Sequence, residues 1–168
     1  MDALRADRVR GSVAATELGW RRLVDHFPAG MLDETRVVTV TAIPFPPVTA
    51  FGLPEFAPMA TTPMAGITFG DMYFVRPDAP EGVHFHELVH VVQWNALGLS
   101  DFLLTYAVGL IQHEYAQSPL EAIAFDLQAR FERMAPPGLV SDEVTRHAAA
   151  ARDAAAALFT AHGFSMRR

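Results

Sequence analysis

The stretch VHFHELVHVVQWNALG, residues 83–98, places three histidines and a glutamate inside an apolar run. Its periodicity predicts a helix over 83–97, with Gly98 as the C-terminal cap. Its valines and Leu88 would bury such a helix, yet a buried histidine without a partner is costly. The fold must therefore pack this helix on several sides and supply a partner for its polar groups.

His86 and His90 stand four positions apart, so on a helix they lie on one face, about 40° apart. Both imidazoles can then bind one ion at about 2.0–2.1 Å, and Glu87 can lie beside that ion without binding it. This HExxH pattern is typical of zinc proteases. The alternative is a core helix whose histidines bond to backbone. His84 lies about 200° from His86, so we expect either an ordinary, partly exposed histidine or a helper of the site.

A catalytic zinc usually has three protein ligands and one open position. The chain has no cysteine, so the third ligand must be His, Asp or Glu. The later candidates are Asp101, His113, Glu114, Glu121, Asp126, Glu132 and His147. Glu121 is favoured because it opens an apolar helix, although a first-turn glutamate also suits the helix dipole. Asp126 lies about 140° around that helix and should not bind the same ion.

The rest of the pattern predicts one domain over 1–168 with an α+β arrangement. A strand or hairpin turning at Gly70-Asp71 is expected within 65–77. The proline-rich segment 44–63 is either packed in extended form or a lid that contacts substrate. The expected elements are a helix over 3–27, strands within 35–77, and helices over 101–115, 119–134 and 141–162.

The charge and hydropathy of the chain argue against two classes of protein, nucleic-acid binders and membrane-spanning proteins. The formal net charge of −6 and the pI near 5.6 argue against a nucleic-acid binder. The longest apolar stretch, 102–111, is about half the length of a membrane span, and the N-terminus has no apolar signal region. We therefore expect a cytoplasmic protein without a membrane span; its oligomeric state stays open.

The ordered motifs resemble a known family. HELVH followed by a later helix with a glutamate is similar to the gluzincin branch of zinc metallopeptidases. A closer likeness is to short bacterial zincin-like proteins, which share ITFGDMYFV, HELVHVVQ, FLLTYAVGLI, a tyrosine and Pro-x-Glu-x-x-Ala, over about residues 65–130. The resemblance implies a minimal zincin-like domain, with a small, mostly antiparallel sheet packed on helices. It also implies one zinc ion and Glu121 as its third ligand. Phe125 departs from it, because many gluzincins have an aspartate there.

These residues and the resemblance predict a zinc-dependent hydrolase, most simply a metallopeptidase acting on peptide or protein. Glu87 would be the general base. Tyr115 would stabilise the oxyanion, with His113, Tyr106 and His147 as alternatives, or would only pack. Strand 67–75 could bind an extended peptide if it lies at a sheet edge. The rival function is a zinc-binding regulatory or structural module with little or no hydrolysis.

Overall fold

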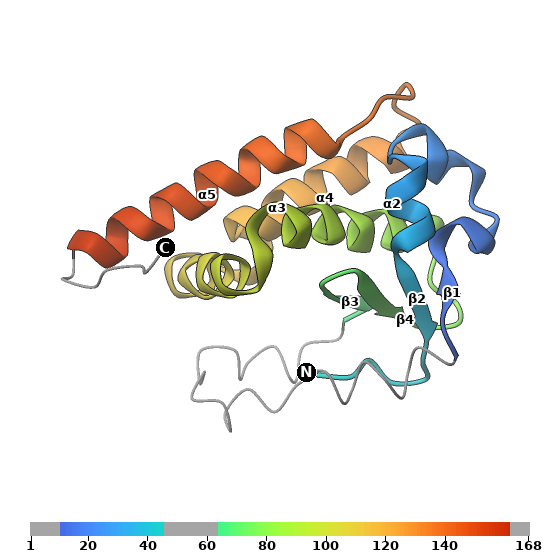
Figure 1. The fold of residues 1–168 in the computed structure, drawn as a ribbon, viewed down its shortest axis with the longest axis horizontal. Helices are drawn as coiled ribbons and strands as arrows, with labels where there is room; N and C mark the ends of the chain where they lie inside the picture. Colours follow the sequence, from blue (N-terminus) through green and yellow to red (C-terminus); the bar gives the residue numbers. More distant parts are fainter. Residues whose placement is uncertain (1–10, 46–63, 162–168) are drawn as a thin grey trace.

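A computed structural model describes residues 11–45 and 64–161. The fold is α+β, with a small sheet on one side of a layer of helices (Figure 1). The strands are β1 (Val13–Ala14), β2 (Arg36–Thr39), β3 (Gly66–Phe69) and β4 (Met72–Val75). The α-helices are α2 (Ala29–Glu34), α3 (Glu81–Gln112), α4 (Pro119–Glu132) and α5 (Ser141–Ala161). Short 3₁₀ turns are η2 (Ala15–Leu18), η3 (Arg21–Asp25) and η6 (Tyr115–Gln117).

The sheet has the strand order β1-β2-β4-β3 and is mixed. The central strands β2 and β4 are parallel, while β1–β2 and β3–β4 are antiparallel. The predicted hairpin is confirmed: β3 and β4 turn at Gly70, whose φ of 66° is left-handed and favours glycine. Within the part of the chain that the structure describes, β3 forms one edge of the sheet.

The predicted helix over 3–27 is wrong for residues 11–27. Val13 and Ala14 pair with β2, and two 3₁₀ turns follow. Gly19, with φ of 74°, separates these turns, and the apolar residues of this segment are spaced too irregularly to bury one face of a helix. Leu23 and Phe27 nevertheless enter the main core. Of the strands predicted within 35–77, the first is β2, which covers only Arg36–Thr39. The two interpretations of the proline-rich segment 44–63 fall mostly on 46–63, outside the described residues.

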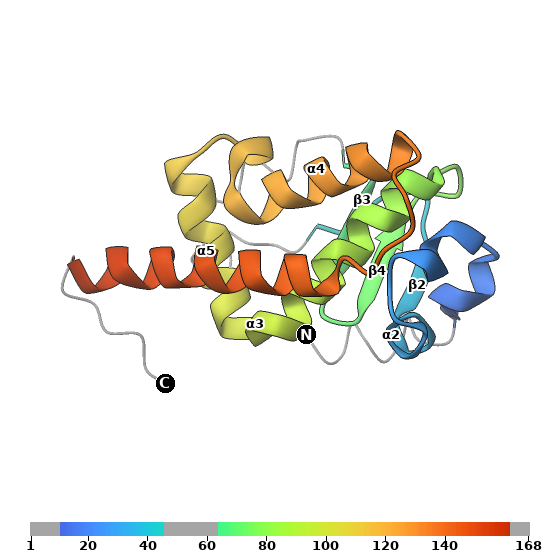
Figure 2. The same ribbon diagram turned by 90° about the horizontal axis from the view of Figure 1, so that it is seen from above.

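Helix α3 is the central element of the fold. Its first half lies between the hairpin β3–β4 and the helices α4 and α5 (Figures 1 and 2). Apolar residues on several sides of this half, including Phe85, Leu88 and Val91, are fully buried. Gly98 interrupts the helix with φ of 70° and ψ of 174°, and beyond it the second half turns away (Figure 2). The predicted break at Gly98 is thus confirmed, without a separate loop.

Helix α3 is also long enough, and contains a stretch apolar enough, to be a candidate membrane span by length and composition. The buried core helix of a globular protein can be equally long and apolar. The break at Gly98 divides α3 into pieces of about 25 Å and about 21 Å, both shorter than the roughly 30 Å hydrocarbon core of a bilayer. The absence of a membrane span stays a prediction.

Helices α4 and α5 lie close to their predicted ranges. Pro119 occupies the first turn of α4, where its missing N–H costs nothing. Helix α5 packs along α3 and contacts α4 as well (Figure 2). This packing brings the first turn of α4 against the HELVH segment of α3.

Candidate metal centre

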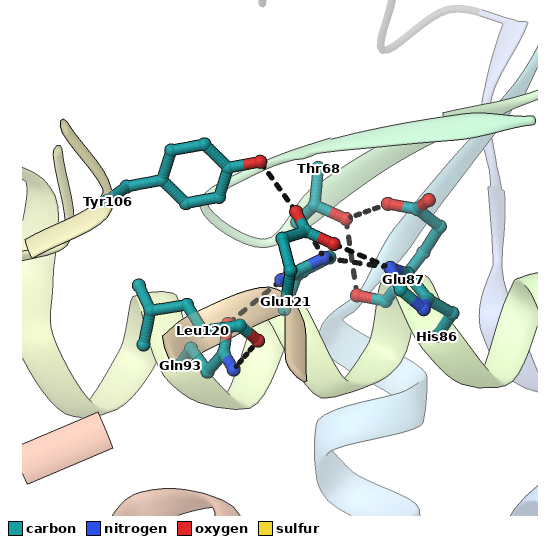
Figure 3. Close-up of polar contacts among 8 residues, drawn as sticks. Thr68, His86, Glu87, Gln93, Tyr106, Leu120 and Glu121 are labelled. Carbon is teal, nitrogen blue, oxygen red and sulfur yellow. Dashed lines mark hydrogen bonds and ion pairs between the residues drawn. The ribbon is translucent and has the colours of Figure 1, made fainter. Parts of the chain in front are cut away.

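Three buried side chains from two helices converge at one point (Figure 3). His86 and His90 come from the first half of α3, and Glu121 comes from the first turn of α4. His86 Nε2 lies 3.3 Å from Glu121 Oε2, and His90 Nε2 lies 3.4 Å from Glu121 Oε1. All the candidate ligand atoms lie within 4.8 Å of one another, so the group could hold a metal ion.

The local sequence explains this convergence. The four-residue spacing puts both imidazoles on one face of α3, as expected. Glu121 is only 2% exposed, between the buried Leu120 and Ala124. Ala124 lies about one turn further along α4, and its small side chain allows the two helices to pack closely.

The charges of the three residues are strongly coupled. Burial would raise the pKa of Glu121, but both histidines outweigh it and hold that pKa well below its usual range. Burial would lower the pKa of His90, but the Glu121 carboxylate raises it to about 9. A buried carboxylate at this place therefore demands a positive charge beside it.

The donor set fits a divalent ion such as zinc. The two Nε2 atoms of His86 and His90 are 3.0 Å apart, and two lone pairs cannot face each other so closely. Either a proton or a cation must lie between them. Two imidazole nitrogens and one carboxylate are the ligands of many catalytic zinc sites.

Glu87 lies beside this group but points toward the sheet. Its Oε2 accepts a hydrogen bond of 2.7 Å from the Thr68 hydroxyl on β3 (Figure 3). A Cβ on Gly66 would overlap Glu87 Oε1, so only glycine allows this close approach. Burial raises the pKa of Glu87, although His86, His90 and Thr68 act in the opposite direction. As the HExxH pattern predicts, Glu87 is adjacent to the histidines without joining the three-residue group.

Two residues near the histidines make contacts that the sequence did not predict. The Oε1 atom of Gln93 lies 2.8 Å from His90 Nδ1, and the signal in the sequence is the glutamine that ends HELVHVVQ. Phe125, 38% exposed, packs on the His86 ring with a centroid distance of 4.6 Å. His86 Nδ1 is buried and has no hydrogen-bond partner among the described residues. The two histidines are therefore held in different ways.

Two tyrosines, Tyr106 and Tyr115, also lie close to Glu121. The Tyr106 hydroxyl, on the second half of α3, donates a hydrogen bond of 2.5 Å to Glu121 Oε1. Tyr115, in η6, is partly buried and interacts with both Glu121 and Tyr106. Burial and the Glu121 charge raise both tyrosine pKa values, so both phenols stay protonated at neutral pH. Tyr115 is thus near the group, and its oxyanion role stays a prediction.

The structure does not bring the remaining candidates to the group. His113 and Glu114 are exposed at the end of α3, and Asp126 pairs with Arg130 at 3.1 Å. The expectation of a partly exposed His84 is wrong: it is 5% exposed, and its Nδ1 lies 2.9 Å from the Tyr73 hydroxyl. It faces away from His86, as its helical angle predicted.

Comparisons with protein-family models, with curated proteins and with solved structures gave no match. The function must therefore be argued from the residues of the site.

Proposed function

We propose that this chain is a zinc-dependent hydrolase, most simply a metallopeptidase. The observation that carries the proposal is the buried group of His86, His90 and Glu121 with Glu87 beside it. Two imidazoles, one carboxylate and an adjacent unliganded carboxylate are what a metal-assisted hydrolysis requires.

His86, His90 and Glu121 would hold the zinc ion. Zinc bound there would polarise a substrate carbonyl and lower the pKa of a water molecule. Glu87, as the carboxylate, would accept a proton from the attacking water and deliver it to the leaving amine. Burial raises the pKa of Glu87, and a raised pKa makes a carboxylate a stronger base. Tyr115 is proposed as the donor that stabilises the oxyanion.

The position of β3 supports a peptide substrate. This strand is an edge of the sheet within the described residues, and it contacts Glu87 through Thr68. An extended peptide can add to such an edge by main-chain hydrogen bonds. A peptide bond aligned along β3 would lie near Glu87, which is the arrangement that hydrolysis needs.

A zinc-binding module with little hydrolysis is the second candidate. His86 Nδ1 has no hydrogen-bond partner among the described residues, whereas ligand histidines are normally oriented by one. A purely structural zinc site, however, normally has four protein ligands. Among the residues that the structure describes, the group contains three, which favours an open position and hence catalysis.

The test combines zinc analysis with peptide cleavage. Glu87→Gln should keep about one zinc per chain and lose cleavage of a mixed peptide library. Glu121→Ala should lose zinc, and Glu114→Gln, at an exposed residue near the end of α3, should change neither. Zinc binding without cleavage by the wild-type protein would favour the module. No zinc in the wild-type protein would exclude both functions.

A further inference from the structure

Gln93 is a fully buried polar residue on α3, three positions after His90. Its side-chain amide makes two hydrogen bonds, each of 2.8 Å. The nitrogen Nε2 donates to the backbone carbonyl of Leu120 (Figure 3). The oxygen Oε1 faces His90 Nδ1. Gln93 thus connects His90 on α3 with Leu120, the residue that precedes the third ligand, Glu121, on α4.

The carbonyl of Leu120 fixes the direction of this chain of bonds. A backbone carbonyl only accepts, so the NH₂ group of Gln93 must point toward Leu120. The oxygen of the same amide must then face His90, and it too only accepts. His90 Nδ1 must therefore carry a proton and donate it. In neutral His90 the lone pair is consequently on Nε2, the atom that faces His86 and Glu121.

We propose that Gln93 is the positioning residue of the metal centre. It holds the His90 ring with Nε2 directed at the ion and ties the HELVH segment of α3 to the first turn of α4. The proposal rests on the zinc site proposed above. It implies an unequal pair of ligands: Gln93 orients His90 in advance, whereas His86 is held through the packing of Phe125 on its ring.

Zinc affinity, measured by competition with a chelator, gives the first test. Gln93→Leu removes both hydrogen bonds and should weaken zinc binding about 10- to 100-fold. Gln93→Glu keeps an acceptor for His90 Nδ1 and loses the donor to Leu120, so it should recover most of the affinity. Leu127→Ala removes buried volume from α4, away from the ligands, and controls for destabilisation. Equal zinc affinity in Gln93→Leu and the wild-type protein would overturn the proposal.

The metal-free protein gives a second test that does not depend on zinc. Nitrogen-15 NMR should show a slowly exchanging Nδ1–H of His90 in the wild-type protein, in Leu127→Ala and in Gln93→Glu. Gln93→Leu should lose that protection. A protected Nδ1–H that persists in Gln93→Leu, or is missing from the wild-type protein, would contradict the assigned bond. If the wild-type protein binds no zinc but this pattern holds, the zinc site fails and the hold of Gln93 on His90 stands. If Gln93→Leu does not fold, the spectrum and affinity of Gln93→Glu decide.

Discussion

The hydroxyl of Thr68 lies 2.7 Å from Oε2 of Glu87 and donates a hydrogen bond to it. Thr68 belongs to β3, an edge of the sheet that the described residues form, and Glu87 belongs to the central helix α3. The bond therefore joins the proposed peptide-binding strand to the proposed base. It also stabilises the charged form of Glu87 against the cost of burial. The sheet therefore contributes directly to the chemistry expected of the helix.

Thr68→Val should shift the acidic limb of the kcat/KM profile to higher pH. The valine has a similar shape but no hydroxyl, so the pKa of Glu87, already raised by burial, should rise further. At neutral pH we expect about a tenfold loss of kcat/KM, which corresponds to one hydrogen bond of about 1.4 kcal/mol. Thr68→Ser keeps the hydroxyl and should keep the limb in place. An unchanged limb in Thr68→Val would show that Thr68 does not tune Glu87.

Gly66→Ala should impair cleavage while leaving zinc in place. The added Cβ would overlap Glu87 Oε1, so the carboxylate must move. A displacement of about 1 Å at a reacting group can cost about 10²-fold in rate. Steady-state kinetics and zinc analysis check the two parts separately. Gly30→Ala is the matched control, because its Cβ would meet no atom within 4 Å. Full activity of Gly66→Ala would argue against Glu87 as the base.

Tyr106→Phe and Tyr115→Phe should separate ligand support from oxyanion stabilisation. Tyr106 donates directly to Glu121, so its loss should weaken zinc binding about tenfold and lower the free energy of unfolding by about 1–3 kcal/mol. Tyr115→Phe should lower kcat more than zinc affinity, if Tyr115 acts on the oxyanion. Chelator competition, denaturant unfolding and kinetics give the three readouts. A Tyr115→Phe protein with weakened zinc affinity but an unchanged kcat at saturating zinc would assign Tyr115 to the metal site instead.

The stability of the metal-free protein should fall between pH 6.5 and 9. His90 has a pKa of about 9 in the fold and 6.5 as its ordinary value, so its stabilising effect is complete below pH 6.5 and is lost as pH rises through about 9. The Glu121 pKa is lowered, so its contribution is present above about pH 4.5 and does not change in this range.

The measurement is urea unfolding in the presence of a chelator. The Glu87→Gln background removes the ionisation of the base, whose raised pKa would also make stability fall as pH rises and would be confused with the effect of His90. Zinc affinity should rise over the same pH range, because the ion must displace the proton of His90. Stability that is constant from pH 6.5 to 9 would contradict a charged His90 in the metal-free site.

The sequence predicted the parts of the site that depend on local periodicity. His86 and His90 share a helical face because of their spacing, and Glu121 was favoured because its neighbours are apolar. The break at Gly98 followed from the same periodicity. These features require no knowledge of the remaining chain.

Local periodicity does not predict contacts between segments that are distant in the sequence. The hydrogen bond between Gln93 and Leu120 depends on how α3 and α4 pack, and the Thr68–Glu87 bond depends on the position of the sheet edge. His84 looked exposed because no local pattern revealed the Tyr73 hydroxyl on β4. The helix predicted for the N-terminal segment was wrong for a similar reason. Val13 and Ala14 take a strand conformation because β2 lies beside them.

His90 and Glu121 come from different helices, and this has a thermodynamic consequence for the whole chain. An ion held between α3 and α4 has its full set of ligands only while the two helices are packed together, so it binds the folded chain in preference to the unfolded one. At a free zinc concentration one hundred times the Kd, such binding adds about 2.7 kcal/mol to the free energy of unfolding. Melting temperature and resistance to proteolysis would then follow the free zinc concentration around the protein.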